Sequence, residues 1–255
     1  MKKFLKIVAI LGTIIALGAI VYGGVKLYRI DKEYKEVDET YAKVLDICID
    51  DNLTVDVSEL EEDEHIENVE SVFKVNWEEL KNINQDSIAW IRIDDTNINY
   101  PIVQGTDNEE YIKKDIYKNT SKGGCIFVDC NSINPFHDLN TVVYGHNLNN
   151  GAMFNDLKKY ENEEFARDHR KIYIAMENES LRIYKVFGFA KVNWDNNEIY
   201  DNSVNDLNDL YERIGKYNQI NIVENLDTSK PVITLSTCTN ANKNERYVVF
   251  AYLDV

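Results

Sequence analysis

Three side chains in this sequence have the chemistry needed for nucleophilic catalysis. Cys238 ends the run TLSTC at residues 234–238, and Arg246 follows eight residues later, at the start of another apolar run. A guanidinium next to a thiol favours the thiolate, which is the nucleophilic form of cysteine. His146, within the run YGHN at residues 144–147, is a suitable proton carrier. Together the three residues predict a site at which a cysteine acts as nucleophile.

Each of the three residues also has a purely structural explanation. A free cysteine at a strand end is more often part of the core than a catalyst. Arg246 could cap a solvated strand end, and His146 could be an ordinary loop residue. Cys238 and His146 both lie where a predicted strand gives way to a loop, which is where scaffolds commonly present reactive groups. Their positions therefore favour the functional interpretation.

The segments around His146, Cys238 and Arg246 resemble the signature regions of the sortases, the cysteine transpeptidases of Gram-positive surfaces. The resemblance covers roughly residues 75–253 and is specific to class B sortases. Five further segments carry it: residues 88–91 (IAWI), 97–104 (NINYPIVQ), 107–108 (DN), 124–129 (GCIFVD) and 153–157 (MFNDL).

The resemblance implies a role for each of the three residues. Cys238 would attack the scissile carbonyl of a peptide and form a thioacyl enzyme. His146 would protonate the departing amine and later deprotonate the incoming one. Arg246 would hold the substrate carbonyl or oxyanion with its fork of donors, a task that backbone amides near Cys238 could share.

The resemblance also points to substrate-binding positions. Ser236 matches a position that contacts substrate in class B sortases, although its hydroxyl could equally bond to the barrel. Asn108 and Ile112 match positions that line the substrate groove. Tyr144 is a further candidate for lining the site, with simple packing as the alternative. Thr239 stands where some members have glutamate, and this puts a substrate contact at that position in doubt.

The resemblance implies a substrate and an acceptor. The substrate would be a surface protein with a C-terminal sorting signal of the Pro-x-Thr-Gly/Asn type, cleaved after Thr and joined to an amine of a cell-wall peptide. No cofactor or metal is expected. Two other classes of protein remain open: a secreted cysteine protease with water as acceptor, and a non-catalytic membrane-anchored scaffold. Papain-like proteases place Cys before His in the chain, whereas His146 precedes Cys238 here.

Composition narrows the class further. The net charge of −16 argues against nucleic-acid binding, which needs a clustered excess of Lys and Arg. Residues 50–70 contain ten Asp or Glu and no Lys or Arg, which predicts a solvated spacer. The four cysteines are too few for a disulfide scaffold, and no Cys or His pair has zinc-ligand spacing. Cys125 is interpreted as a space-filling residue.

The apolar run at residues 7–25 predicts a transmembrane helix, because 19 residues nearly span a bilayer core. A cleaved signal peptide is the alternative. Lysines flank both ends of the run, so charge does not set the orientation. The short N-terminus and the family resemblance predict a single-pass membrane protein with residues 1–6 inside the cell, residues 26–74 as a helical and acidic stalk, and residues 75–255 as an extracellular catalytic domain.

The rest of the chain predicts a mainly β fold: a closed, mostly antiparallel eight-stranded barrel with N-terminal helices and a long helix inserted between late strands. Helices are expected at residues 31–49, 66–73, 77–81 (capped by Asn76), 153–160 and 203–217. Strands are expected at residues 88–93, 97–103, 125–129, 140–144, 171–176, 181–191, 231–237 and 246–253.

Overall fold

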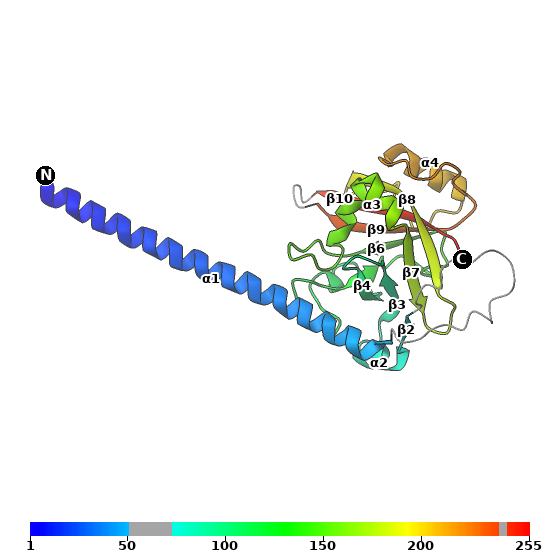
Figure 1. The fold of residues 1–255 in the computed structure, drawn as a ribbon, viewed down its shortest axis with the longest axis horizontal. Coiled ribbons are helices and arrows are strands. Elements are labelled where there is room, and N and C mark those ends of the chain that lie inside the picture. The colour runs from blue at the N-terminus through cyan, green and yellow to red at the C-terminus, as the bar shows by residue number, and fades with distance from the viewer. Residues whose placement is uncertain (51–72, 240–243) are drawn as a thin grey trace.

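Eight strands of the chain close into a barrel, and a long N-terminal helix docks beside it (Figure 1). The structure is a computed structural model that describes residues 1–50, 73–239 and 244–255. The barrel strands are β3 (Ser87–Arg92), β4 (Asn99–Val103), β5 (Ile126–Val128), β6 (Asn140–Tyr144), β7 (Lys171–Met176), β8 (Arg182–Asn193), β9 (Val232–Cys238) and β10 (Glu245–Leu253). The predicted fold is therefore confirmed, with strand ends within two residues of the predicted ones.

Around the barrel the strand order is β10-β8-β7-β3-β4-β5-β6-β9, and β9 closes the ring onto β10. Six of the eight neighbouring pairs are antiparallel. The pairs β4–β5 and β6–β9 are parallel. Closure leaves no strand of the barrel with an unpaired edge, so its backbone donors and acceptors are satisfied within the sheet.

Strands β9 and β10 are buried on both faces, which explains why their sequences are nearly continuous apolar runs. The inward-facing residues Leu235 and Val249 belong to the main core. Val248 and Phe250 point the other way and pack under helix α4 (Leu207–Tyr217). The site residues at the ends of these strands are thus held by packing on two sides.

Helix α4 begins at Leu207, later than the predicted residue 203. Asp206 is its N-cap, and its carboxylate accepts a hydrogen bond from the backbone of Asn208 at 2.9 Å. A capping aspartate supplies an acceptor for otherwise unpaired amides and so marks the start of a helix. Three smaller helical elements complete the fold: η2 (Glu110–Ile112), η3 (Asn155–Glu161) and α3 (Glu163–Asp168). The predicted helix at 153–160 corresponds to η3, which is a 3₁₀ helix.

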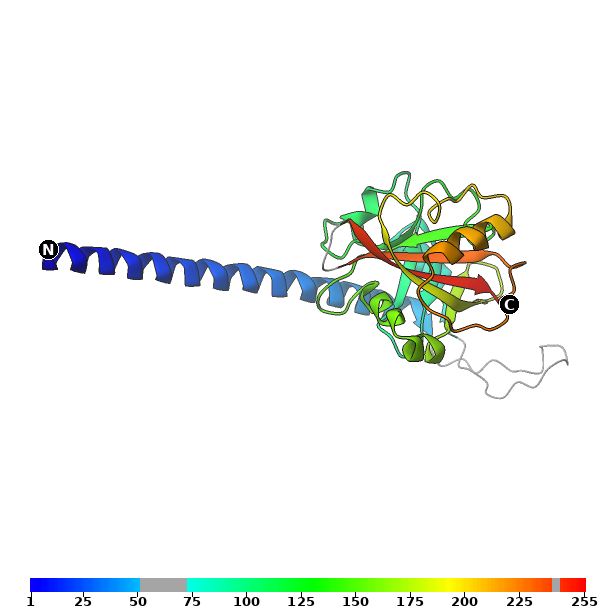
Figure 2. The ribbon, with the colours of Figure 1, turned by 90° about the horizontal axis from the view of Figure 1, so that it is seen from above.

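Helix α1 (Lys2–Cys48) extends far beyond the barrel, as Figures 1 and 2 show. At 1.5 Å per residue a helix of this length spans about 70 Å. Its free half carries an apolar window long enough to cross a membrane, judged by length and composition. Its last three turns bury Val37, Tyr41 and Val44 in the barrel core. The predicted helix at 31–49 is the docking half of this longer element.

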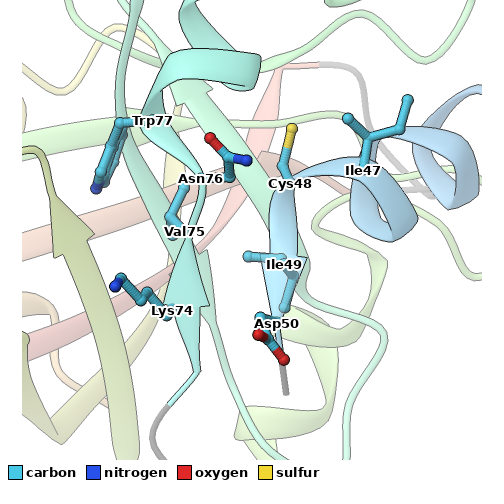
Figure 3. Close-up of a pocket in the computed structure, with 8 residues that line it drawn as sticks. All are labelled: Ile47, Cys48, Ile49, Asp50, Lys74, Val75, Asn76 and Trp77. Carbon is cyan, nitrogen blue, oxygen red and sulfur yellow. The ribbon is translucent and has the colours of Figure 1, made fainter. Parts of the chain in front are cut away.

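The end of α1 joins the barrel through a small two-stranded sheet, formed by β1 (Ile49–Asp50) and β2 (Lys74–Val75). Helix α2 (Trp77–Ile83) follows, and Asn76 caps it by accepting a hydrogen bond from the Glu79 amide, as predicted. A pocket of about 440 Å³ opens at this junction, with side chains from α1, β1, β2 and α2 around it (Figure 3). The predicted helix at 66–73 and most of the acidic stretch lie outside the described residues.

A buried asparagine on β6 ties the barrel to the segment between β8 and α4. Asn140 is fully buried, and its amide donates to the carbonyls of Ile199 and Asp201 at 3.0 and 3.2 Å. Its side-chain oxygen accepts from the Thr234 hydroxyl on β9 at 2.8 Å. Because all three contacts are buried, this one side chain fixes both the β6–β9 pair and the 199–201 segment.

We expect Asn140→Ala to lower the free energy of unfolding by about 2 to 3 kcal/mol, because it leaves buried polar groups without partners. Denaturant unfolding of the full chain in detergent micelles, followed by tryptophan fluorescence, measures the change. Asn221→Ala, at an exposed position, is the matched control and should change stability by less than about 0.5 kcal/mol. Equal effects of the two substitutions would contradict this assignment.

Candidate active site

The register of strands β6, β9 and β10 brings the three predicted catalytic residues to one end of the barrel. In the parallel β6–β9 pair, Tyr144 lies opposite Ser236. His146 and Cys238 each follow two residues later, so they leave neighbouring strands at the same level. In the antiparallel β9–β10 pair, Cys238 lies opposite Arg246. Residues directly opposite each other point to the same face of a sheet, so the thiol lies between the imidazole and the guanidinium.

Hydrogen bonds lock the loop after β6 to the end of β9. The Gly145 amide donates to the Ser236 carbonyl at 3.1 Å, and the Thr237 hydroxyl donates to the Gly145 carbonyl at 2.7 Å. The Asn147 side chain donates to the Cys238 carbonyl at 2.8 Å. These contacts continue the β6–β9 pairing past the end of β6. The relative position of His146 and Cys238 is therefore set by a ladder of bonds on either side of each residue.

Gly145 has a packing role in this turn. A β-carbon at this position would lie 2.8 Å from the ring of Phe154 and would also collide with Ile126. Only glycine therefore lets the chain leave β6 so close to the core and place His146 beside Cys238. Asn155 supports the next residue, because its amide donates to the Asn147 side-chain oxygen at 2.6 Å.

The ring of His146 is oriented by a backbone carbonyl. Its Nε2 lies 2.7 Å from the carbonyl oxygen of Ile112, at the end of η2. A carbonyl oxygen only accepts hydrogen bonds, so Nε2 carries a proton in this arrangement. Nδ1 is then the nitrogen that exchanges a proton when the ring acts as an acid or base. The side chains of His146, Cys238 and Arg246 are all partly exposed, so a substrate can reach them.

Two tyrosines and an aspartate form one wall of the site. The Tyr144 hydroxyl donates to Asp129 at 3.0 Å, and its ring packs against that of Tyr200 with centroids 6.0 Å apart. The Tyr200 hydroxyl lies 3.0 Å from the Ser236 hydroxyl. Burial raises the pKa of Tyr200 to about 12, although the Ser236 hydrogen bond and the charge of Arg246 lower it. Burial and the charge of Asp129 likewise raise the pKa of Tyr144, so both phenols remain neutral at physiological pH.

The four predicted substrate-binding residues occupy different parts of this site. Ser236 is buried and bonded to Tyr200, and Tyr144 is partly buried beside it. The Asn108 amide donates to Asp129 at 3.0 Å, while its oxygen accepts from the backbone of Cys130 at 2.8 Å. Asn108 thus belongs to the Asp129 wall. Ile112 lies on the opposite side of the site and meets His146 through its carbonyl.

Tyr200, Asp129 and Asn147 were not predicted as site residues. Asn147 directly follows the histidine, so its position in the YGHN run was an available signal. Asp129 closes the GCIFVD run, but nothing in the run indicates that it accepts from both Tyr144 and Asn108. Tyr200 lies in an irregular segment between β8 and α4, and only the fold brings it to Ser236.

The chain was compared with known proteins, and a family model for the sortase domain matches residues 91–254. Sortase B of Listeria monocytogenes is 29% identical over 181 residues, covering 70% of this chain and 73% of the relative. Sortase B of Staphylococcus aureus is 29% identical over 255 residues, covering 98% and 97%.

Solved structures agree with the sequence relatives. Sortase B of Bacillus anthracis, in complex with AAEK1, superposes with a TM-score of 0.68 at 27% identity, covering 87% of this chain and 98% of that one. Sortase B of Clostridium perfringens has a TM-score of 0.64 at 31% identity, covering 70% and 100%. The chain belongs to the sortase family. Within it the chain is a class B sortase, and it is accordingly a cysteine transpeptidase of the cell surface that acts on sorting-signal substrates and amine acceptors.

The four cysteines differ in how readily they can react. Burial raises the pKa of Cys48 to about 11 and that of Cys125 to about 12. Burial and the charge of Asp129 also raise the pKa of Cys130. A thiol with a pKa of 11 is about 0.01% thiolate at pH 7, and the thiolate is the reactive form.

At pH 7 we expect a thiol-alkylating reagent to modify Cys238 first, Cys130 more slowly, and Cys48 and Cys125 only after unfolding. Labelling of Cys130 should accelerate as the pH rises, because its raised pKa keeps it protonated at neutral pH. Peptide mapping by mass spectrometry of the full chain measures the order, with Cys238→Ala as the control. Faster labelling of Cys130 than of Cys238 at pH 7 would contradict the expectation.

Proposed function

We propose that this chain is a membrane-anchored transpeptidase in which Cys238 is the nucleophile, His146 transfers the protons and Arg246 stabilises the oxyanion. The observation that carries the proposal is the strand register, which places Cys238 opposite Arg246 and level with His146. A nucleophile, a proton carrier and a fixed positive charge at one point are what acyl transfer requires.

In the acylation half of the proposed reaction, the Cys238 thiolate adds to the carbonyl carbon of the scissile bond. The carbonyl electron pair moves onto oxygen, and Arg246 holds the resulting oxyanion with charge-assisted hydrogen bonds. The oxyanion then collapses, the peptide C–N bond breaks, and imidazolium His146 gives its proton to the departing amine. The products are a thioacyl enzyme and a free amine.

In the transfer half, the incoming amine attacks the thioester carbon. His146, now neutral, takes the proton that this amine loses, and the C–S bond breaks to return the Cys238 thiolate. The new amide joins the substrate to the acceptor, and the enzyme is restored as a thiolate–imidazolium pair. The Ile112 carbonyl remains bonded to Nε2 throughout, so Nδ1 carries the exchanged proton in both halves.

The proposed substrate groove lies between two walls of this site. Asn108, Tyr144 and Ser236 belong to the wall that also contains Asp129 and Tyr200. Ile112 lies on the side of His146. In this proposal Ser236 acts through the hydroxyl of Tyr200, because Ser236 itself is buried.

The proposed donor is a surface protein with a C-terminal sorting signal of the Pro-x-Thr-Gly/Asn type, cleaved after Thr. The proposed acceptor is an amine on a cell-wall peptide. Two structural neighbours support these classes: a Staphylococcus aureus sortase B–substrate complex, and a sortase B complexed with triglycine. They superpose with TM-scores of 0.62 and 0.63, respectively.

The apolar half of α1 supports the proposed membrane anchor, with residues 1–6 in the cytoplasm and the barrel outside the cell. Strand β10 begins on the side of the barrel from which α1 projects and ends at the C-terminus on the other side (Figures 1 and 2). The start of β10 carries Arg246. The active site therefore faces the proposed membrane, from which a sorting signal and a cell-wall precursor would both be presented.

We expect the full chain in detergent micelles to cleave quenched sorting-signal peptides after Thr and to join the acyl part to a glycine or diaminopimelate-type amine. Cys238→Ala should abolish both products, because the thioacyl intermediate cannot form. Liquid chromatography with mass spectrometry identifies the peptide, the amide product and any free acid.

Cys130→Ala is the matched control for this experiment, since it removes the other partly exposed thiol and should leave turnover unchanged. Free acid as the sole product, even with abundant amine, would favour a protease instead. Turnover that survives Cys238→Ala would exclude the proposed nucleophile.

A further inference from the structure

Helix α1 contacts the active site through a buried tyrosine. Tyr41 is 6% exposed, and its hydroxyl donates to the carbonyl oxygen of Gly124 at 2.5 Å. The same hydroxyl lies 3.4 Å from the sulfur of Cys125. Burial raises the pKa of Tyr41 well above its usual value, so the hydroxyl stays protonated and can donate at any working pH.

The segment that Tyr41 holds lies directly against His146. Gly124 has a φ of +57°, and a β-carbon there would lie 2.8 Å from the Ile112 carbonyl oxygen and 3.1 Å from Cδ2 of His146. The next residue, Cys125, donates its backbone amide to the Tyr111 carbonyl at 2.9 Å. Gly124 is therefore the spacer between the Tyr41 hydroxyl on one side and the Ile112–His146 hydrogen bond on the other.

A second set of contacts links α1 to the backbone of the histidine loop. The Tyr41 ring meets that of Tyr100 edge-on, with centroids 5.3 Å apart. The Tyr100 hydroxyl accepts from the Met153 amide at 3.1 Å, and the adjacent Phe154 amide donates to the His146 carbonyl at 2.8 Å. The ring of Tyr41 supports the backbone of His146, while its hydroxyl supports the imidazole.

We propose that Tyr41 is a positioning residue for His146, so that the helix that anchors the enzyme also orients its proton carrier. The proposal rests on the proposed catalytic role of His146. The hydroxyl fixes Gly124, Gly124 fixes the Tyr111–Ile112 turn, and the Ile112 carbonyl holds the proton on Nε2 of His146. Nδ1 is thereby kept as the nitrogen that serves the reaction.

Loss of the Tyr41 hydroxyl predicts a specific defect. Gly124 would lose its buried donor, the turn at 111–112 could move, and the neutral imidazole would populate both tautomers. The chemical steps need Nδ1 in its correct protonation state, whereas substrate binding does not. The kcat should therefore fall while KM changes little.

The first test compares Tyr41→Phe with wild type, both as full chain in detergent micelles, using a sorting-signal peptide and an amine. The phenylalanine ring keeps the contact with Tyr100 and removes only the hydroxyl. We expect kcat to fall about 3- to 10-fold, the range for loss of one hydrogen bond, with KM within about twofold. Tyr34→Phe, a partly buried tyrosine of the same helix, is the matched control and should leave kcat unchanged.

The second test needs no turnover. Nitrogen-15 NMR of histidine-labelled full chain, with His146 assigned by His146→Gln, reports which ring nitrogen carries the proton in the neutral form. We expect Nε2–H in wild type and in Tyr34→Phe, and a mixture in Tyr41→Phe. An unchanged tautomer in Tyr41→Phe, or an equal change in Tyr34→Phe, would overturn the proposal. If no variant turns over peptide but the tautomer depends on Tyr41, the positioning role stands and the proposed function fails.

Discussion

The parallel pairing of β6 with β9 is the constraint on which the rest of this active site depends. Parallel neighbours end at the same edge of a sheet, so residues that follow the two strands meet there. His146 and Cys238 each stand two residues beyond the pair Tyr144–Ser236. A slip of one residue in this register would turn one of the two side chains to the other face. Buried contacts of Asn140 and Thr234 at the far end of the pair oppose such a slip.

The second constraint is the packing of the barrel's reactive end against other elements. The ring of His146 depends on a backbone carbonyl of η2, which in turn depends on the segment before β5. That segment contacts Tyr41 on α1. Stability and chemistry are thus connected, because the same buried residues of α1 that complete the core also set the geometry near the imidazole.

Much of this arrangement could be predicted from sequence. Short apolar runs separated by Asn, Asp and Gly predicted the barrel strands, because strand ends and turns depend on local residue chemistry. The stripe of Val37, Tyr41 and Val44 predicted the buried face of α1 for the same reason. The resemblance to class B sortases came from motifs around the three site residues, and the family comparison confirmed it.

The rest depends on contacts between distant segments, which local patterns do not encode. The parallel pairs β4–β5 and β6–β9 follow from the closure of the whole barrel. Tyr200 reaches Ser236 across 36 positions of sequence, and Tyr41 reaches Gly124 across 83. The surface that the stripe on α1 would cover was equally invisible, because an amphipathic helix shows that a face is buried but not against what.

The most direct test of the account is the site and rate of acylation. The full chain is mixed with a sorting-signal peptide without amine, quenched in acid, digested and mapped by tandem mass spectrometry. The account predicts a thioester on Cys238 alone, formed more slowly in Arg246→Lys by about 10²- to 10³-fold, the usual effect of losing an oxyanion donor. An acyl group on another cysteine, or an unchanged rate in Arg246→Lys, would contradict it.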